Sequence, residues 1–149
     1  MKFIADSMLG SLAKWLRILG YDTLYFPHLD DDELAYRAMA EERVLLTRDQ
    51  ELARRRGVRA LLIKSSSLEE QLLQVFKELG LETRNSFSRC PICNEPLNPV
   101  NKESVREKVP LYVFQTHEHF SACPTCHRIY WRGSHWQRMK ECLDKLTRS

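Results

Sequence analysis

Four of the five cysteines stand in two Cys-x-x-Cys pairs. Cys90 and Cys93 form the first pair, and Cys123 and Cys126 form the second, with 29 residues between the pairs. Two such pairs supply four thiolates, the ligand set of a tetrahedral structural zinc site, and each pair makes a tight knuckle at the tip of a hairpin. The pattern therefore predicts one structural zinc ion with no open position for water.

Other uses of these residues fit the sequence less well. A redox-active dithiol would be one such motif inside a βαβ unit, and disulfides are rare in cytosolic chains. Asn94 and His127 follow the two pairs, and both residue types tolerate the positive φ that a knuckle requires. The leftover Cys142 is predicted to be a buried thiol on the last helix. His135 and the His-Glu-His at 117–119 lack a partner at a fixed spacing, which disfavours them as metal ligands.

A second set of candidate ligands is acidic and follows the apolar segments of the first half. Asp6 comes after Phe-Ile-Ala, the cluster 30–33 opens an expected helix, and Asp49 comes after Val-Leu-Leu-Thr-Arg, with Glu51 two residues on. In a parallel sheet all these points lie on the carboxyl edge, where ligands gather. Oxygen ligands at an open edge suit magnesium or manganese, and such an ion supports phosphodiester hydrolysis.

A simpler interpretation makes some of these carboxylates helix caps. Asp31 and Asp49 each precede or open a helical pattern, where aspartate is a favoured N-cap. Asp6 is harder to explain in this way, because it lies between an apolar strand and an apolar helix, where an unpaired carboxylate is costly. Asp6, Asp31 and Asp49 at one edge favour a metal site.

The elements that must position these residues alternate along the first 80 residues. Short apolar segments at 2–5, 22–26, 43–47 and 58–63 are typical of strands. Amphipathic segments at 8–19, 31–42, 50–56 and 68–79 are typical of helices, the last with Ser67 and Glu70 as a capping box and Gly80 as its stop. This order predicts an α/β fold with a mostly parallel sheet covered by helices on both faces.

The composition and periodicity of the sequence change after Gly80, and two domains are expected, at 1–82 and 88–149. The second domain has short strands predicted around Leu111 to Val113 and at Phe120, and a final helix. It carries ten Lys/Arg against six Asp/Glu, whereas residues 1–87 carry 13 against 14. Its aromatic residues Tyr130, Trp131 and Trp136 lie beside arginines. They predict either contacts with unpaired nucleic-acid bases or a small core against the first domain.

Longer motifs resemble a known family. The segments "FIADSMLGSLAKWLRILGYDT" and "DDDELAYRAMAEERVLLTRDQELARR", followed by a four-cysteine ribbon ending "IYWRGSHW", are similar to the ribonuclease domain at the C-terminus of Mut-seven proteins. That family belongs to the PIN-like nucleases and ends in a zinc ribbon, and the resemblance spans roughly residues 2–140. It implies a PIN-like fold and divalent-cation-dependent cleavage of RNA.

The resemblance also implies which residues act. It places Asp6, Asp31 and Asp49 in the acidic site, with Asp30 and Asp32 as neighbours that could substitute for Asp31. Where PIN-like sites often have a fourth acid, this chain has Glu51, a departure that bears on a second metal position.

Lys14, Arg17 and Arg48 are the cations expected near the phosphates of a substrate, and the expected substrate is single-stranded RNA. The alternatives are a non-catalytic RNA-binding protein with the same fold and, more distantly, a toxin-like nuclease controlled by a partner protein. The interrupted apolar start at Asp6 and the absence of a long apolar run predict a cytoplasmic protein without a membrane span.

Overall fold

The computed structural model describes residues 1–147 and contains the expected parallel sheet. Its strands are β1 (Phe3–Ala5), β2 (Thr23–Tyr25), β3 (Val44–Thr47) and β4 (Ala60–Leu62). The order across the sheet is β2-β1-β3-β4, and every neighbouring pair is parallel. The chain therefore runs outward from β1 to β2 on one side and continues through β3 and β4 on the other. The carboxyl ends of β1 and β3 meet where this direction reverses.

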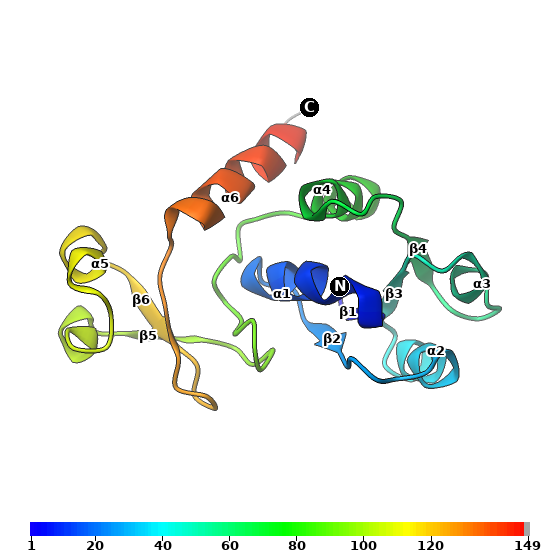
Figure 1. The fold of residues 1–149 in the computed structure, drawn as a ribbon, viewed down its shortest axis with the longest axis horizontal. Coiled ribbons are helices and arrows are strands. Elements are labelled where there is room, and N and C mark those ends of the chain that lie inside the picture. The colour runs from blue at the N-terminus through cyan, green and yellow to red at the C-terminus, as the bar shows by residue number, and fades with distance from the viewer. Residues whose placement is uncertain (148–149) are drawn as a thin grey trace.

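Helices cover both faces of the sheet, as predicted. They are the 3-10 turn η1 (Ser7–Leu9) and α1 (Gly10–Ile18), α2 (Asp31–Ala40), α3 (Gln50–Ala53) and α4 (Leu68–Leu79). Phe3 and Ala5 of β1 pack with α1 and α4, while Ile4 between them packs with α2 and α3. Because both faces are buried, the central strands β1 and β3 are apolar except for Thr47, while the edge strands β2 and β4 are partly exposed. Figure 1 shows α1 and α4 on one side of the sheet and α2 and α3 on the other.

The start of α4 differs in detail from the prediction. Ser67 occupies the N-cap position, but its side chain makes no capping hydrogen bond. Its backbone N–H donates to the Ser65 hydroxyl at 3.0 Å, and that hydroxyl donates to the Glu70 carboxylate at 2.5 Å. The predicted capping box is therefore wrong, because a serine two residues earlier occupies the acidic partner. Gly80 ends the helix at φ +63, as expected.

The four-cysteine segment forms a small antiparallel sheet. Its strands are β5 (Asn98–Val100), β6 (Phe120–Ala122) and β7 (Ile129–Tyr130), in that order, with the short turn η2 (Lys102–Val105) and helix α5 (Leu111–Thr116) between β5 and β6. The prediction of a strand at Leu111 to Val113 is therefore wrong. Val113 is four residues after Val109, and both enter the ribbon core, whereas Leu111 and Tyr112 stay exposed. Val109 lies before α5, so within the helix burial falls on Val113 and the partly buried Phe114, and this tertiary contact overrides the β-favouring composition.

The last helix, α6 (Ser134–Thr147), leaves the ribbon and packs beside α4 (Figure 1). Trp136, Met139 and Leu143 belong to the same buried cluster as Phe3 and Phe76 of the first half. The ribbon is therefore tied to the sheet by a shared core, and the division at 1–82 and 88–149 stays a prediction. No helix among the described residues has the length and apolar character needed to cross a membrane.

Candidate functional site

The four predicted zinc ligands come together. The sulfurs of Cys90, Cys93, Cys123 and Cys126 all lie within 4.8 Å of one another. Each pair forms the same knuckle, in which the N–H of the third residue after the first cysteine donates to the sulfur of that cysteine. These N–H···S distances are 3.4 Å for Cys93 and 3.5 Å for Cys126. The cluster could hold a zinc ion with four sulfur ligands.

The residues after the two knuckles have the conformation expected of them. Asn94 has φ +63 and His127 has φ +62, both in the left-handed region. Their N–H groups donate to the carbonyls of Cys90 and Cys123 at 2.8 and 2.9 Å. The prediction of positive φ at these positions is confirmed.

Electrostatics at the cluster favour a bound cation. The hydrogen bond from the Arg128 backbone lowers the pKa of Cys126 to about 6. Desolvation and the neighbouring sulfurs of Cys126 and Cys123 raise the pKa of Cys93 to about 12. One thiol therefore ionises readily while the crowded sulfurs oppose the next ionisation. A divalent cation with thiolate ligands removes this conflict.

The first knuckle is fastened to the amino end of the parallel sheet through Asn94. The Asn94 side-chain oxygen accepts a 3.1 Å hydrogen bond from the N–H of Thr23, the first residue of edge strand β2. Its side-chain nitrogen donates to the Asp22 carboxylate at 2.7 Å. Asp22 in turn accepts from the buried Arg43, which also donates to the carbonyl of Phe3. Asn94, whose backbone conformation belongs to the knuckle, thus also provides a hydrogen-bond acceptor for the edge strand β2.

Arg17 takes part in this attachment. Its Nε donates to the Thr23 carbonyl at 2.8 Å, and its terminal nitrogen donates to the carbonyls of Pro91 and Ile92 at 2.9 and 3.3 Å. Burial lowers the pKa of Arg17, against the opposing effects of Cys90 and Asp22. These contacts give Arg17 a structural task at the end of the sheet away from the acids, and its predicted contact with substrate stays a prediction.

At the opposite end of the sheet, Asp6 lies directly after β1 and is 7% exposed. One carboxylate oxygen accepts from the Met8 N–H at 3.0 Å and caps the 3-10 turn. The other accepts from the Thr47 hydroxyl at 2.5 Å. This nearly buried carboxylate is held in place from two sides.

Asp49 follows the neighbouring strand β3. One of its oxygens accepts from the N–H groups of Glu51 and Leu52, at 2.8 and 3.1 Å, so the expected alternative of a helix cap is present. The Asp49 N–H donates to the Thr47 hydroxyl at 3.0 Å. Because Thr47 also bonds Asp6, one buried hydroxyl connects both acids. Sequence reasoning missed Thr47, whose only signal is a polar residue ending a fully buried strand.

The third acidic position lies at the start of α2. Asp30, not Asp31, is the N-cap, accepting from the Glu33 N–H at 2.8 Å, so a cap at Asp31 is wrong. Asp32 forms a 2.6 Å ion pair with Arg55. Asp30, Asp31 and Asp32 line an open pocket of about 430 Å³ with Arg55.

The acids are less tightly gathered than the thiols. Within residues 1–147, the four cysteines are the one group of at least three His, Cys, Asp or Glu side chains drawn close enough to hold a metal ion. Asp6, Asp31 and Asp49 do not form such a group. Glu51 is exposed in the first turn of α3.

Two of the predicted substrate-binding cations are exposed. Arg48 lies between Thr47 and Asp49 at the carboxyl edge, and Lys14 lies on α1. Both positions leave the side chains accessible to solvent, as contact with phosphate requires.

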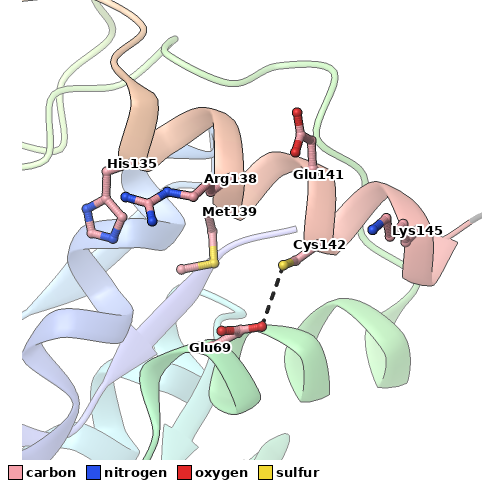
Figure 2. A pocket seen from close by; sticks show the side chains of 7 residues that line it. All are labelled: Glu69, His135, Arg138, Met139, Glu141, Cys142 and Lys145. Atoms are coloured by element: carbon pink, nitrogen blue, oxygen red, sulfur yellow. Dashed lines mark hydrogen bonds between the residues drawn. The ribbon is translucent and has the colours of Figure 1, made fainter.

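The other singled-out residues mostly serve packing. Trp136 is 6% exposed and stacks edge-on with Phe87 at 5.0 Å, which favours the core interpretation for this side chain. The Tyr130 hydroxyl lies 3.2 Å from the Cys90 sulfur, and Trp131 is half-buried in the ribbon core. Cys142 is not the buried thiol that was predicted. It is half-exposed and its sulfur donates to Glu69 at 3.5 Å (Figure 2).

Comparison with known proteins agrees with the motifs in the sequence. A family model described as the Mut7-C RNAse domain matches residues 1–143, nearly the whole chain. Comparisons with curated proteins and with solved structures gave no match. A ribonuclease family implies RNA as the substrate. On the extent of the family match, the chain belongs to the Mut7-C RNAse domain family.

Proposed function

We propose that this protein is a PIN-like, divalent-cation-dependent ribonuclease that hydrolyses phosphodiester bonds of single-stranded RNA at the carboxyl edge of its parallel sheet. The observation that carries the proposal is the pairing of Asp6 and Asp49. They end neighbouring strands at the point where the strand order reverses, and the Thr47 hydroxyl contacts both residues. Ligands of open α/β sheets bind at such a point.

The buried surroundings of Asp6 argue for a role beyond structure. A carboxylate that only capped a turn could lie in solvent at little cost, whereas Asp6 is only 7% exposed. Thr47 and the Met8 N–H each donate one hydrogen bond to it, and a carboxylate can accept more than two. Asp6 therefore retains lone pairs for a cation.

Asp49 also keeps a free ligand atom. Both capping hydrogen bonds of Asp49 reach the same oxygen, Oδ1, so Oδ2 is left for a second contact. Capping and metal binding are therefore compatible at this residue. We assign Asp31 and Glu51 supporting roles, since both are exposed acids at the starts of helices α2 and α3.

A magnesium or manganese ion at this edge would activate water and stabilise the departing oxygen of the phosphodiester. The residues of the chain hold the substrate around it. Arg48 and Lys14, both exposed, would contact flanking phosphates. We assign the zinc a structural role, because four thiolates leave no position for water. Zinc thiolates persist in a reducing compartment, which supports a cytoplasmic location.

Cleavage of a fluorescent single-stranded RNA, with and without added manganese, tests the proposal. We expect manganese-dependent cleavage by the wild-type protein and a loss of at least about 100-fold in Asp6→Asn and Asp49→Asn, because each change removes a metal-binding charge. Asp144→Asn is the matched control, since it makes the same change on α6, where the carboxylate bonds Thr83 and Lys140. Equal activity in all three variants would refute the proposal.

A second candidate is RNA binding without cleavage. It is favoured by the absence of a tight carboxylate cluster among the described residues, in contrast to the cysteines. The same assay separates the two functions. Shifted but uncleaved RNA at every manganese concentration would support binding alone.

A further inference from the structure

A groove lies between the ribbon helix α5 and the start of α6. It has a volume of about 430 Å³, and four of its lining residues carry aromatic or imidazole rings: Tyr112, His117, Trp131 and His135. We call these four residues the aromatic groove. The Ser134 hydroxyl also lines it, and no carboxylate does. The groove thus offers flat surfaces and hydroxyl groups without negative charge, while the ring nitrogens of His117 already contact the carbonyls of Val113 and Arg132.

Packing does not explain the most prominent of these rings. Tyr112 is 69% exposed, whereas the next residue, Val113, supplies the contact of α5 with the ribbon core. Tyr112 lines the same groove as the half-buried Trp131 and keeps its ring accessible to a ligand. Flat rings of this kind stack on nucleobases.

Two arginines flank the groove. Arg132 lies in the chain between the lining residues Trp131 and Gly133, and its guanidinium lies 5.2 Å from the centre of the Trp136 ring. Arg138 is one helical turn after His135, and Figure 2 shows its side chain extending toward the imidazole. Both arginines are exposed. Their positions allow them to meet the phosphates on either side of a base.

The cleft beyond His135, between α4 and α6, has a different character. It measures about 360 Å³ and is lined by Glu69 and Glu141 as well as by Arg138 and Lys145 (Figure 2). Mixed charge of this kind does not favour a polyanion. An RNA strand would therefore end at Arg138 or turn away there.

We propose that the aromatic groove binds an unpaired RNA base, with Arg132 and Arg138 contacting its flanking phosphates. The identity of the ligand as RNA rests on the proposed function. The combination of aromatic rings with arginines and no acids matches single-strand recognition, in which stacking is sequence-tolerant. The basic excess of the ribbon half, ten Lys/Arg against six Asp/Glu over 88–149, adds long-range attraction.

Helix α1 connects the groove with the acidic edge. His135 packs edge-on against Trp15 of α1, with ring centroids 5.1 Å apart. The exposed Lys14 is the preceding residue, and the helix begins just after Asp6 and η1. The 3-10 turn Ser7–Leu9 adds about 6 Å and α1 from Gly10 to Trp15 about 8 Å, so a short single strand can reach from the acidic edge to the groove.

The experiment measures binding of a fluorescein-labelled oligouridine of about ten nucleotides, within the range of single-strand site sizes, by anisotropy of the zinc-loaded protein without added magnesium or manganese. We expect Tyr112→Ala to weaken binding about 5-fold or more, because it removes one stacking surface. Arg138→Gln should weaken binding and reduce the slope of log affinity against log salt by about 0.7. Leu111→Ala, an equally exposed neighbour on α5, and Arg106→Gln, paired with Glu103, are the controls and should bind normally.

Normal binding by both Tyr112→Ala and Arg138→Gln would overturn the proposal and leave the groove to a protein partner. Weaker binding by all four variants would also overturn it, because the effect would not be local. The result is separable from the proposed function. If the wild-type protein cleaves RNA and the groove variants bind normally, only the proposal of RNA binding in the groove is rejected. If the protein binds RNA through the groove but does not cleave it, only the proposed nuclease activity is rejected.

Discussion

The four-cysteine cluster and the acidic edge lie at opposite ends of the same parallel sheet and are assembled differently. Each Cys pair supplies two ligands from one four-residue knuckle, so only two chain segments must meet. The acids come from separate strand ends and each already has hydrogen-bond partners. Carboxylates repel one another without a cation. A site made by local geometry is thus tight before its ion arrives, whereas one made by tertiary placement stays open.

The largest effect is expected from a substitution in the four-cysteine cluster. Cys90→Ser should lower the zinc content well below one per chain and unfold the ribbon, because zinc binding supplies about 10–16 kcal/mol in comparable four-ligand modules. Cys142→Ser is the matched control, since this thiol is half-exposed and bonded to Glu69. Elemental analysis and circular dichroism measure the outcome. Disulfides at the Cys pairs, or no zinc in wild-type protein prepared without chelator, would contradict it.

A smaller effect is expected from a substitution at the acidic edge, where it tests how the acids are positioned. Thr47→Val removes the hydroxyl at nearly constant volume and so leaves Asp6 and the Asp49 N–H each without one partner. We expect cleavage to fall about 10-fold, as for other residues that orient metal ligands. Thr83→Val, which removes a hydroxyl bonded to Asp144 away from the sheet edge, is the control and should leave cleavage unchanged. Unchanged cleavage in Thr47→Val would show that Thr47 does not position the acids.

The smallest effect concerns the link between the two ends. Asn94→Gly keeps the left-handed conformation but removes the hydrogen bonds to Thr23 and Asp22, so it should lower the free energy of unfolding by about 1–2 kcal/mol without releasing zinc. His127→Gly is the same change at the matching position of the second knuckle, where the side chain is exposed, and should cost less. Denaturant unfolding measures both. Equal losses would mean that the knuckle contact adds no stability to the sheet.

The comparison also shows what sequence patterns can predict. The alternating apolar and amphipathic segments predicted the parallel sheet, and the Cys spacing predicted the cluster, because both signals are local and periodic. The helix at Leu111 to Thr116 was missed, since its β-favouring residues are overruled by burial of Val113 against the ribbon core. The contacts of Arg17 with Pro91 and Ile92, 74 and 75 residues away, depend on tertiary placement that no local pattern records.

The acidic cluster at 30–32 shows, within three residues, that local sequence alone does not predict the role of each side chain. Three neighbouring aspartates, 30 to 32, look equivalent in the sequence, but the structure gives Asp30 the cap and Asp32 an ion pair with Arg55. Asp31 is left as the member of this cluster with neither task among the described residues. Only the start of the helix and the position of α3 distinguish the three.

The most direct test of the acidic site is manganese binding, because it does not depend on the choice of RNA. Electron paramagnetic resonance of the zinc-loaded protein would measure free manganese during a titration. We predict that the wild-type protein binds manganese and that Asp6→Asn and Asp49→Asn each weaken binding at least about 10-fold. Asp144→Asn should bind as the wild type does, and the zinc content should stay the same in all variants. Equal manganese affinity in the wild type, Asp6→Asn and Asp49→Asn would contradict a metal site at this edge.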